Sequence, residues 1–150
     1  MNPLIPPPIV AAIVGVLMWA VNRWLELGRV ESAFQTPAAI VLLVAGLLLM
    51  LVAVASFVAA KTTVNPLRPS RASSLVTTGI FRLSRNPIYL GDLLVLAALA
   101  VWLGNVVNLL LLVPFVWYIN RFQIIPEERA LADRFGASYV AYCSRVRRWL

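Results

Sequence analysis

The stretch from Pro37 to Ala60 contains no charged residue and is almost entirely apolar. A helix crosses the hydrocarbon core of a bilayer with roughly 20 apolar residues, so this stretch predicts a membrane-spanning helix. Composition agrees, because 61% of the 150 residues are hydrophobic and only 13% are charged. A soluble domain of this length is far less apolar. We therefore expect an all-α integral membrane protein with a single domain over residues 1–150.

Three further apolar runs bring the expected number of transmembrane helices to about four. The expected spans cover residues 8–27, 37–60, 87–103 and 106–125. Gly104-Asn105 predicts a tight turn between the last two spans, so these should form a helical hairpin. Pro114 predicts a kink in the last span. The third run is short, which is compatible with a full crossing or with a re-entrant hairpin.

Basic residues predict the orientation in the membrane. Most of the 13 Lys and Arg residues lie between the second and third runs or after the fourth run. Four spans place both regions on one side, and the positive-inside rule makes that side cytoplasmic. We therefore expect both termini and any site near these regions on the cytoplasmic side. Topology and contact with membrane lipids explain most of these charges, but not their clustering around Asn86 and Glu127.

Several classes of function are excluded by what the sequence lacks. There is no histidine and only one cysteine, Cys143, so a disulfide framework, a metal centre and a Ser-His or Cys-His triad are not expected. The basic residues have no interleaved stacking aromatics, which argues against a nucleic-acid partner. No glycine-rich phosphate loop is present.

The segment after the fourth run predicts one amphipathic cytoplasmic helix. Pro126 suits a helix start, and Glu127 and Glu128 then fall in its first turn. An apolar stripe follows at helical spacing, formed by Leu131, Phe135, Tyr139, Tyr142 and Val146. Gly136 is a weak point at which this helix can bend, and the helix should lie on the membrane face or fold back onto the spans. Helix capping is one interpretation of the two carboxylates and ligand binding is the other, with Glu127 the better placed to face inward.

Two motifs in this order resemble the isoprenylcysteine carboxyl methyltransferase family and its small prokaryotic relatives. The first is LVTTGIFRLSRNPIYLGD, residues 75–92, and its matching positions are Gly79, Phe81, Arg85, Asn86, Pro87, Tyr89 and Gly91. The second lies in the tail, at Arg121, Phe122, Glu127, Glu128, Leu131, Phe135, Gly136, Tyr139 and Tyr142. The resemblance covers about residues 62–146 and implies a catalytic region over about residues 62–150.

The resemblance implies an enzyme that uses S-adenosylmethionine to methylate a lipophilic or membrane-embedded small acceptor, with S-adenosylhomocysteine as product. The acceptor would be a thiol, a carboxylate or an amine. The residues implied in cofactor binding are Arg85, Asn86, Pro87, Tyr89, Leu90, Gly91 and Glu128. The residues implied in catalysis are Arg121 and Glu127, although Arg121 at the end of a span also suits simple snorkelling.

One position departs from the pattern of many family members, which have His where this chain has Asn86. Asn donates and accepts hydrogen bonds but does not titrate in the useful range, so it suits cofactor binding and not proton transfer. Asp92 is an ionisable residue inside an apolar run and shares a helix face with Tyr89. A site role and an ion pair with Arg82 or Arg85 are both open for it.

Two other functions are compatible with the sequence. RNPIYLGD also resembles a motif of membrane sterol reductases, which predicts an NADPH-dependent reductase of a sterol-like lipid. The second alternative is a non-catalytic small membrane subunit, for which substitutions at Asn86, Glu127 and Glu128 would be tolerated.

Overall fold

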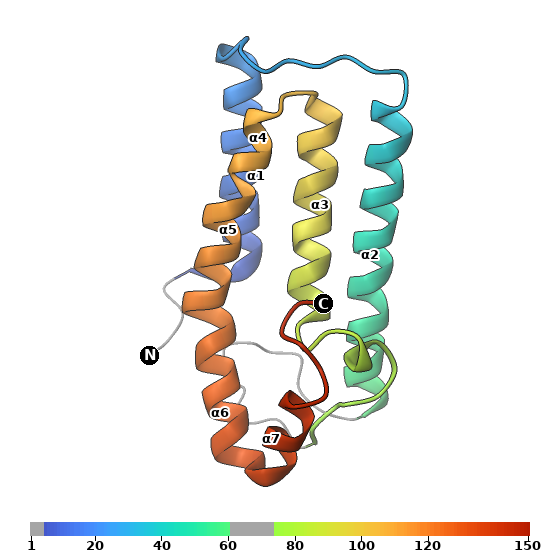
Figure 1. Cartoon of the computed structure of the whole chain (residues 1–150), viewed down its shortest axis with the longest axis vertical. Coiled ribbons are helices and arrows are strands. Elements are labelled where there is room, and N and C mark those ends of the chain that lie inside the picture. Colours follow the sequence, from blue (N-terminus) through green and yellow to red (C-terminus); the bar gives the residue numbers. More distant parts are fainter. Residues whose placement is uncertain (1–4, 61–73) are drawn as a thin grey trace.

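The computed structural model describes residues 5–60 and 74–150. Within these ranges the chain forms helices and turns and contains no β-strand, which confirms the all-α prediction. The long helices stand side by side, with α3 between α2 on one side and α1 and α5 on the other (Figure 1).

The first two helices follow the apolar runs closely. Helix α1 covers Pro7–Trp24 and begins at a proline, whose missing N–H costs nothing in the first turn. It ends at Trp24, earlier than the predicted residue 27, because Leu25 has an extended backbone. Helix α2 covers Gln35–Ala59 and carries no acidic residue in its first turn and no basic residue in its last.

The predicted hairpin is present in the last part of the chain. Helix α3 covers Pro87–Leu103 and ends at Gly104, whose φ of 65° is the left-handed conformation that glycine adopts without strain. Two short helices, α4 (Val107–Leu110) and α5 (Leu112–Ile119), then run back along α3. The two helices are interrupted at Leu111. Pro114 has no N–H to donate to the carbonyl of Leu110, which is the effect from which a kink is predicted here.

Pro126 lies at the start of a helix with Glu127 and Glu128 in its first turn, as predicted, but no break separates this helix from the preceding run. A π-helical turn over Asn120–Ile124 leads directly into α6, Ile125–Phe135. The N–H of Ile125 donates to the carbonyl of Asn120, five residues earlier. This wider turn lets the helix pass the proline without breaking.

The amphipathic helix predicted for the tail is interrupted at its predicted weak point, Gly136. Gly136, with φ 50° and ψ −125°, breaks the tail into α6 and α7, Ala137–Cys143. The apolar stripe nevertheless gathers on one side, because its residues join a single cluster with Ala53 of α2 and Phe81 of the 3₁₀ turn η2, Gly79–Arg82. The tail thus folds back onto the C-terminal end of α2.

The helices are those of an integral membrane protein. Three helical stretches are long and apolar enough to cross a membrane, namely α1, α2 and the stretch Val107–Phe135, which comprises α4, α5, the π-helical turn and α6. Helix α3 has 17 residues and is shorter than these. The count of four spans, and a full crossing by α3, therefore stay predictions.

Close contacts hold α3 in register with its neighbours. At one end, the N–H of Val30 donates to the carbonyl of Gly104 at 2.7 Å, and the side-chain amide of Gln35 donates to the carbonyl of Trp102 at 2.7 Å. Further along, Gly46 of α2 and Gly91 of α3 face each other where a Cβ on either would overlap the partner backbone. These contacts determine where the other end of α3, which begins at Asn86, lies.

Candidate functional site

The start of α3 holds the residues of the first motif in a defined turn. Asn86 is the N-cap residue, and its backbone N–H donates to Ser84 Oγ at 3.1 Å. Pro87 is fully buried at the first helical position. Because Pro87 sets the helix direction, Tyr89 falls on the face of α3 that turns toward α6.

The two motifs meet directly in a hydrogen bond between α3 and α6. The Tyr89 hydroxyl donates to Glu127 Oε1 at 2.6 Å. Tyr89 is buried and belongs to the core cluster that joins α1, α3 and α5. A hydroxyl donor from a packed ring orients the Glu127 carboxylate at the end of a membrane helix. Glu127 therefore faces inward, as its position on the predicted stripe suggests.

Glu128 lies between two guanidinium groups. Its Oε1 is 3.1 Å from Arg85 Nη2, and Arg148 approaches it with two donors, Nε at 3.0 Å from Oε1 and Nη2 at 2.6 Å from Oε2. A two-pronged arginine contact is the strongest common form of carboxylate pairing. The hydrogen bond to Glu128 raises the pKa of Arg148, so its guanidinium stays positively charged.

The segment after α7, residues 144–150, returns to the start of α3. With this returning segment, the side chains of Arg85, Asn86, Tyr89, Glu127 and Glu128 form a polar cluster. The backbone N–H of Arg85 donates to the carbonyl of Arg147 at 3.1 Å, and Asn86 Nδ2 donates to the carbonyl of Arg148 at 2.9 Å. Trp149 Nε1 then donates to Asn120 Oδ1 at 3.2 Å on the π-helical turn. The segment therefore bridges the two helices that carry the motifs.

A second group of contacts connects the cluster to α7 and connects α7 to η2. Arg85 Nη1 donates to Cys143 Sγ of α7. The Tyr142 hydroxyl donates to the carbonyl of Phe81 at 2.6 Å, which ties α7 to η2. Burial raises the pKa of Tyr142 to about 12, so its hydroxyl stays a neutral donor. The cluster is thus enclosed by side chains of α3, α6, α7 and the returning segment.

Most of the predicted site residues are brought together, but not all of them. Arg85, Asn86, Tyr89, Glu127 and Glu128 form one connected set. Arg121 is exposed on the π-helical turn and makes no hydrogen bond or ion pair with residues 5–60 or 74–150.

Three other predicted positions have their own surroundings. Leu90 is buried, and its N–H donates to the carbonyl of Asn86. Gly91 does permit a close approach, but the group that approaches is α2, through Gly46 and Met50. Asp92 is half-buried and forms no ion pair with any described residue, so the predicted pairing with an arginine is not found there.

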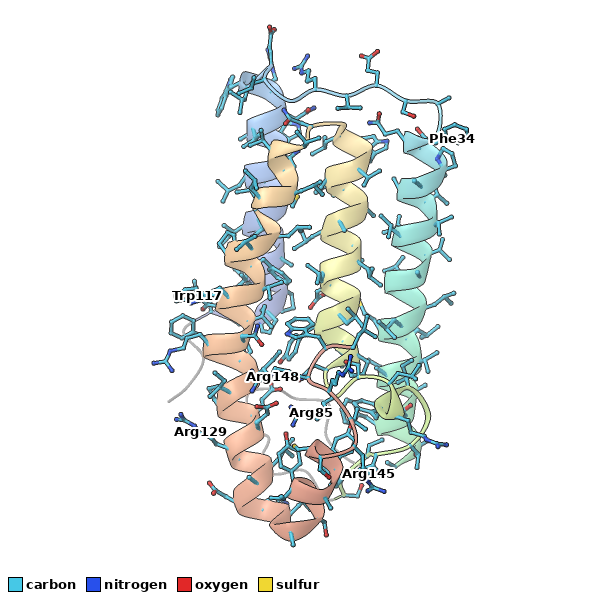
Figure 2. The ribbon with its side chains drawn as sticks, in the orientation of Figure 1. Phe34, Arg85, Trp117, Arg129, Arg145 and Arg148 are labelled. Atoms are coloured by element: carbon cyan, nitrogen blue, oxygen red, sulfur yellow. The ribbon has the colours of Figure 1, made fainter. Side chains whose placement is uncertain are left out.

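Arg148, Cys143 and Trp149 also contact the cluster, although the sequence did not predict this. Figure 2 shows Arg85 and Arg148 lying together near the start of α3, whereas Arg129 and Arg145 point away from it. Arg148 stands in a run of basic residues near a membrane helix, and such a run is explained by membrane orientation alone. Its pairing with Glu128 depends on the return of the chain to α3, which no local sequence pattern predicts.

The fold and the cluster define a class of protein, namely a helical membrane protein with a half-buried polar site that two distant motifs build at one end of its helices. The chain belongs to the phospholipid methyltransferase family, whose model matches residues 34–138. The protein is therefore a methyltransferase, in agreement with the resemblance of its two motifs. This result favours neither the reductase nor the non-catalytic subunit.

Individual relatives support the same family. The chain is similar to the protein-S-isoprenylcysteine O-methyltransferase B of Arabidopsis thaliana, at 32% identity over 80 residues, or 53% of this chain and 41% of that protein. It is also similar to the protein-S-isoprenylcysteine O-methyltransferase of Schizosaccharomyces pombe, at 36% identity over 72 residues, or 48% of this chain and 30% of that protein. This chain thus covers less than half of either enzyme.

A third relative is matched along its whole length. It is an uncharacterized protein of Haemophilus influenzae, 46% identical over 63 residues, which is 42% of this chain and 100% of that protein.

Proposed function

We propose that this protein transfers a methyl group from S-adenosylmethionine to a lipophilic, membrane-embedded small acceptor at the cytoplasmic face of the membrane. The observation that carries the proposal is the connected set of Asn86, Tyr89, Glu127 and Glu128, which joins both motifs at one end of the helices. Membership of a methyltransferase family supports the reaction class.

The residues of the cluster fit the polar ends of this cofactor. Its amino-acid end carries one ammonium and one carboxylate, and the cluster offers the Glu128 carboxylate beside the Arg85 and Arg148 guanidiniums. Arg85 Nε is buried and has no partner among the described residues. An orphaned buried donor costs free energy unless a ligand or a water accepts from it. Asn86 is suited to a hydroxyl group of a ribose.

When bound, S-adenosylmethionine supplies a methyl group on a sulfonium, which leaves in an in-line displacement without a metal. The residues of this chain align the acceptor with that methyl group and exclude water. A thiol or amine acceptor must also lose a proton, and Glu127 is the carboxylate that we assign to accept it, oriented by the Tyr89 hydroxyl. We assign Arg121, which contacts none of these groups, to the acceptor.

The lengths of the helices support an acceptor that lies within the bilayer. Helices α2 and α3 are level at one end, where Gln35 bonds the carbonyl of Trp102. Helix α2 has 25 residues and α3 has 17. At a rise of 1.5 Å per residue, α3 therefore begins about 12 Å short of the other end of α2. The cluster would then lie at the depth of lipid chains and not above the headgroups.

Charge supports the cytoplasmic location. The end of the molecule with the cluster carries Arg82, Arg85, Arg129, Arg134, Arg145, Arg147 and Arg148. Among the described residues, the opposite end carries two basic side chains, Arg23 and Arg29. This asymmetry is the one that the positive-inside rule associates with the cytoplasmic side. Lys61, Arg68 and Arg71, which contribute to the same prediction, lie outside the described residues.

Calorimetric binding to detergent-purified protein tests the proposal. We would titrate S-adenosylmethionine, S-adenosylhomocysteine and NADPH into the wild type and into Asn86→Ala and Glu128→Ala. The matched control is Arg129→Gln, which changes an exposed residue adjacent to Glu128. We expect the sulfur ligands to bind, each site variant to weaken them about tenfold or more, and the control to match the wild type.

The contrary outcomes are equally clear. A well-folded wild type that binds neither sulfur ligand would refute the proposal, and an NADPH signal would then favour the reductase. If binding is found, incubation of membranes with methyl-labelled cofactor and extraction of lipids would identify the acceptor.

A further inference from the structure

The backbone around Arg148 is held against the start of α3 independently of its side chain. The carbonyl of Arg148 accepts from Asn86 Nδ2 at 2.9 Å and from Ser84 Oγ at 3.4 Å. The carbonyl of Arg147 accepts from the backbone N–H of Arg85 at 3.1 Å. The Arg148 side chain therefore starts from a fixed point next to Asn86, whichever group its guanidinium contacts.

The guanidinium of Arg148 is the more accessible of the two that pair with Glu128. Its side chain is 36% exposed, whereas that of Arg85 is 14% exposed and also contacts Cys143. The Arg85 guanidinium alone satisfies Glu128 Oε1 at 3.1 Å. Arg148 can therefore turn away from Glu128 without leaving this carboxylate unpaired, because Arg85 stays in place.

The Arg148–Glu128 pair has the charge pattern of an α-amino acid in reverse. A guanidinium that grips a carboxylate with two parallel donors binds a ligand carboxylate in the same way. A carboxylate released from one guanidinium binds an ammonium group in its place. A zwitterionic ligand that enters between them exchanges one ion pair for two, and no buried charge loses its partner.

We propose that Arg148 binds the carboxylate of the methyl donor's amino-acid end, while Glu128 binds the ammonium of the same end. This assignment rests on the proposed function, because it needs a ligand with a free α-amino acid. It adds a binding residue from the returning segment to the two motifs. It also gives a role to the second guanidinium on Glu128, since Arg85 alone already pairs with that carboxylate.

The test compares ligands with and without the carboxylate. S-adenosylhomocysteine carries it, and decarboxylated S-adenosylmethionine keeps the amine and the adenosine but lacks it. We would measure both dissociation constants by calorimetry for the wild type, Arg148→Gln, Arg148→Lys and Arg145→Gln. Arg145 is the matched control, because it is exposed and its Nε donates only to the nearby carbonyl of Ala141 at 3.1 Å.

We expect Arg148→Gln to weaken S-adenosylhomocysteine by about 10- to 100-fold, the range for hydrogen bonds to charged groups. The affinity for the decarboxylated ligand should change by less than about twofold. Arg148→Lys keeps the positive charge and loses the two parallel donors of the guanidinium. Its affinity for S-adenosylhomocysteine should therefore lie between those of the wild type and Arg148→Gln, with the affinity for the decarboxylated ligand unchanged. Arg145→Gln should bind both ligands like the wild type.

Three results would overturn the assignment. If Arg148→Gln and Arg148→Lys weaken both ligands equally, Arg148 has a structural role only. If neither variant affects either ligand, Arg148 stays on Glu128 in the complex. If the wild type binds no adenosyl ligand at all, the proposed function and this assignment both fail, which distinguishes that case from the other two.

Discussion

The packing of α2 against α3 allows a quantitative prediction for Gly46→Ala. A Cβ at Gly46 would lie 2.9 Å from the carbonyl oxygen of Gly91, 3.1 Å from Leu94 Cβ and 3.1 Å from Val95 Cγ2. The nearest of these atoms belongs to the backbone and cannot rotate away. The two helices must therefore separate, and close contact through small residues is what holds membrane helices together.

A second glycine provides the matched control. A Cβ at Gly15 of α1 would meet only Leu99 Cδ2 at 3.4 Å, an ordinary contact. Replacing glycine by alanine inside a helix gains about 1 kcal/mol of helix propensity, and both variants receive this gain. Overpacking costs about 1–3 kcal/mol and applies to Gly46 alone. The difference between the two variants therefore isolates the cost of the helix contact.

We expect the free energy of unfolding of Gly46→Ala to lie about 1–3 kcal/mol below that of Gly15→Ala. Titration with SDS in mixed micelles, followed by far-UV circular dichroism, would measure it. Gly46→Ala should also weaken S-adenosylhomocysteine, because the displaced α3 carries Asn86 and Tyr89. The reasoning is refuted if Gly46→Ala is as stable as Gly15→Ala.

Three more predictions concern the enclosing tail and the orientation. Tyr142→Phe removes the hydrogen bond to the buried carbonyl of Phe81 and should cost about 1–3 kcal/mol in the same unfolding assay. Burial raises the pKa of Tyr142 from 10.0 to about 12, so the unfolded chain loses this proton first. Stability should therefore fall between about pH 10 and 12, and less steeply in Tyr142→Phe; equal pH curves would contradict this. In a Cys143→Ser background, an impermeant maleimide should label Ser138→Cys from the cytoplasmic side and Ser32→Cys from the opposite side, and labelling of both from one side would contradict the topology.

The parts of the fold that the sequence predicts correctly are those with strong local signals. Pro87 must begin a helix because its ring fits only the first turn, and Gly104 ends that helix because a left-handed residue is needed there. The apolar runs specify helices because an exposed backbone is too costly in lipid. The meeting of Tyr89 with Glu127 follows from these local rules and from the hairpin, since both residues lie at the same end of adjacent antiparallel helices.

The parts that the sequence does not predict depend on contacts between distant segments. Pro126 correctly predicts the start of α6, but not the π-helical turn that joins α6 to the preceding helix without a break. Gly136 reads as a weak point, but whether it bends or breaks the helix depends on the packing of α7 against α2 and η2. Arg148 reads as a solvated charge, and only the return of the chain to Asn86 brings it to Glu128.

The balance of charge in the cluster bears on which cofactor the site accepts. Two carboxylates, Glu127 and Glu128, lie at the end of a membrane helix, where an unpaired charge is costly. Tyr89 satisfies one of them, and Arg85 and Arg148 satisfy the other. A ligand with a cationic and an anionic end can replace these partners group for group. A dinucleotide brings several negative phosphates and no cation for the two carboxylates, so it would leave like charges facing each other. We therefore expect the charges of the cluster to favour a zwitterionic sulfonium cofactor over NADPH.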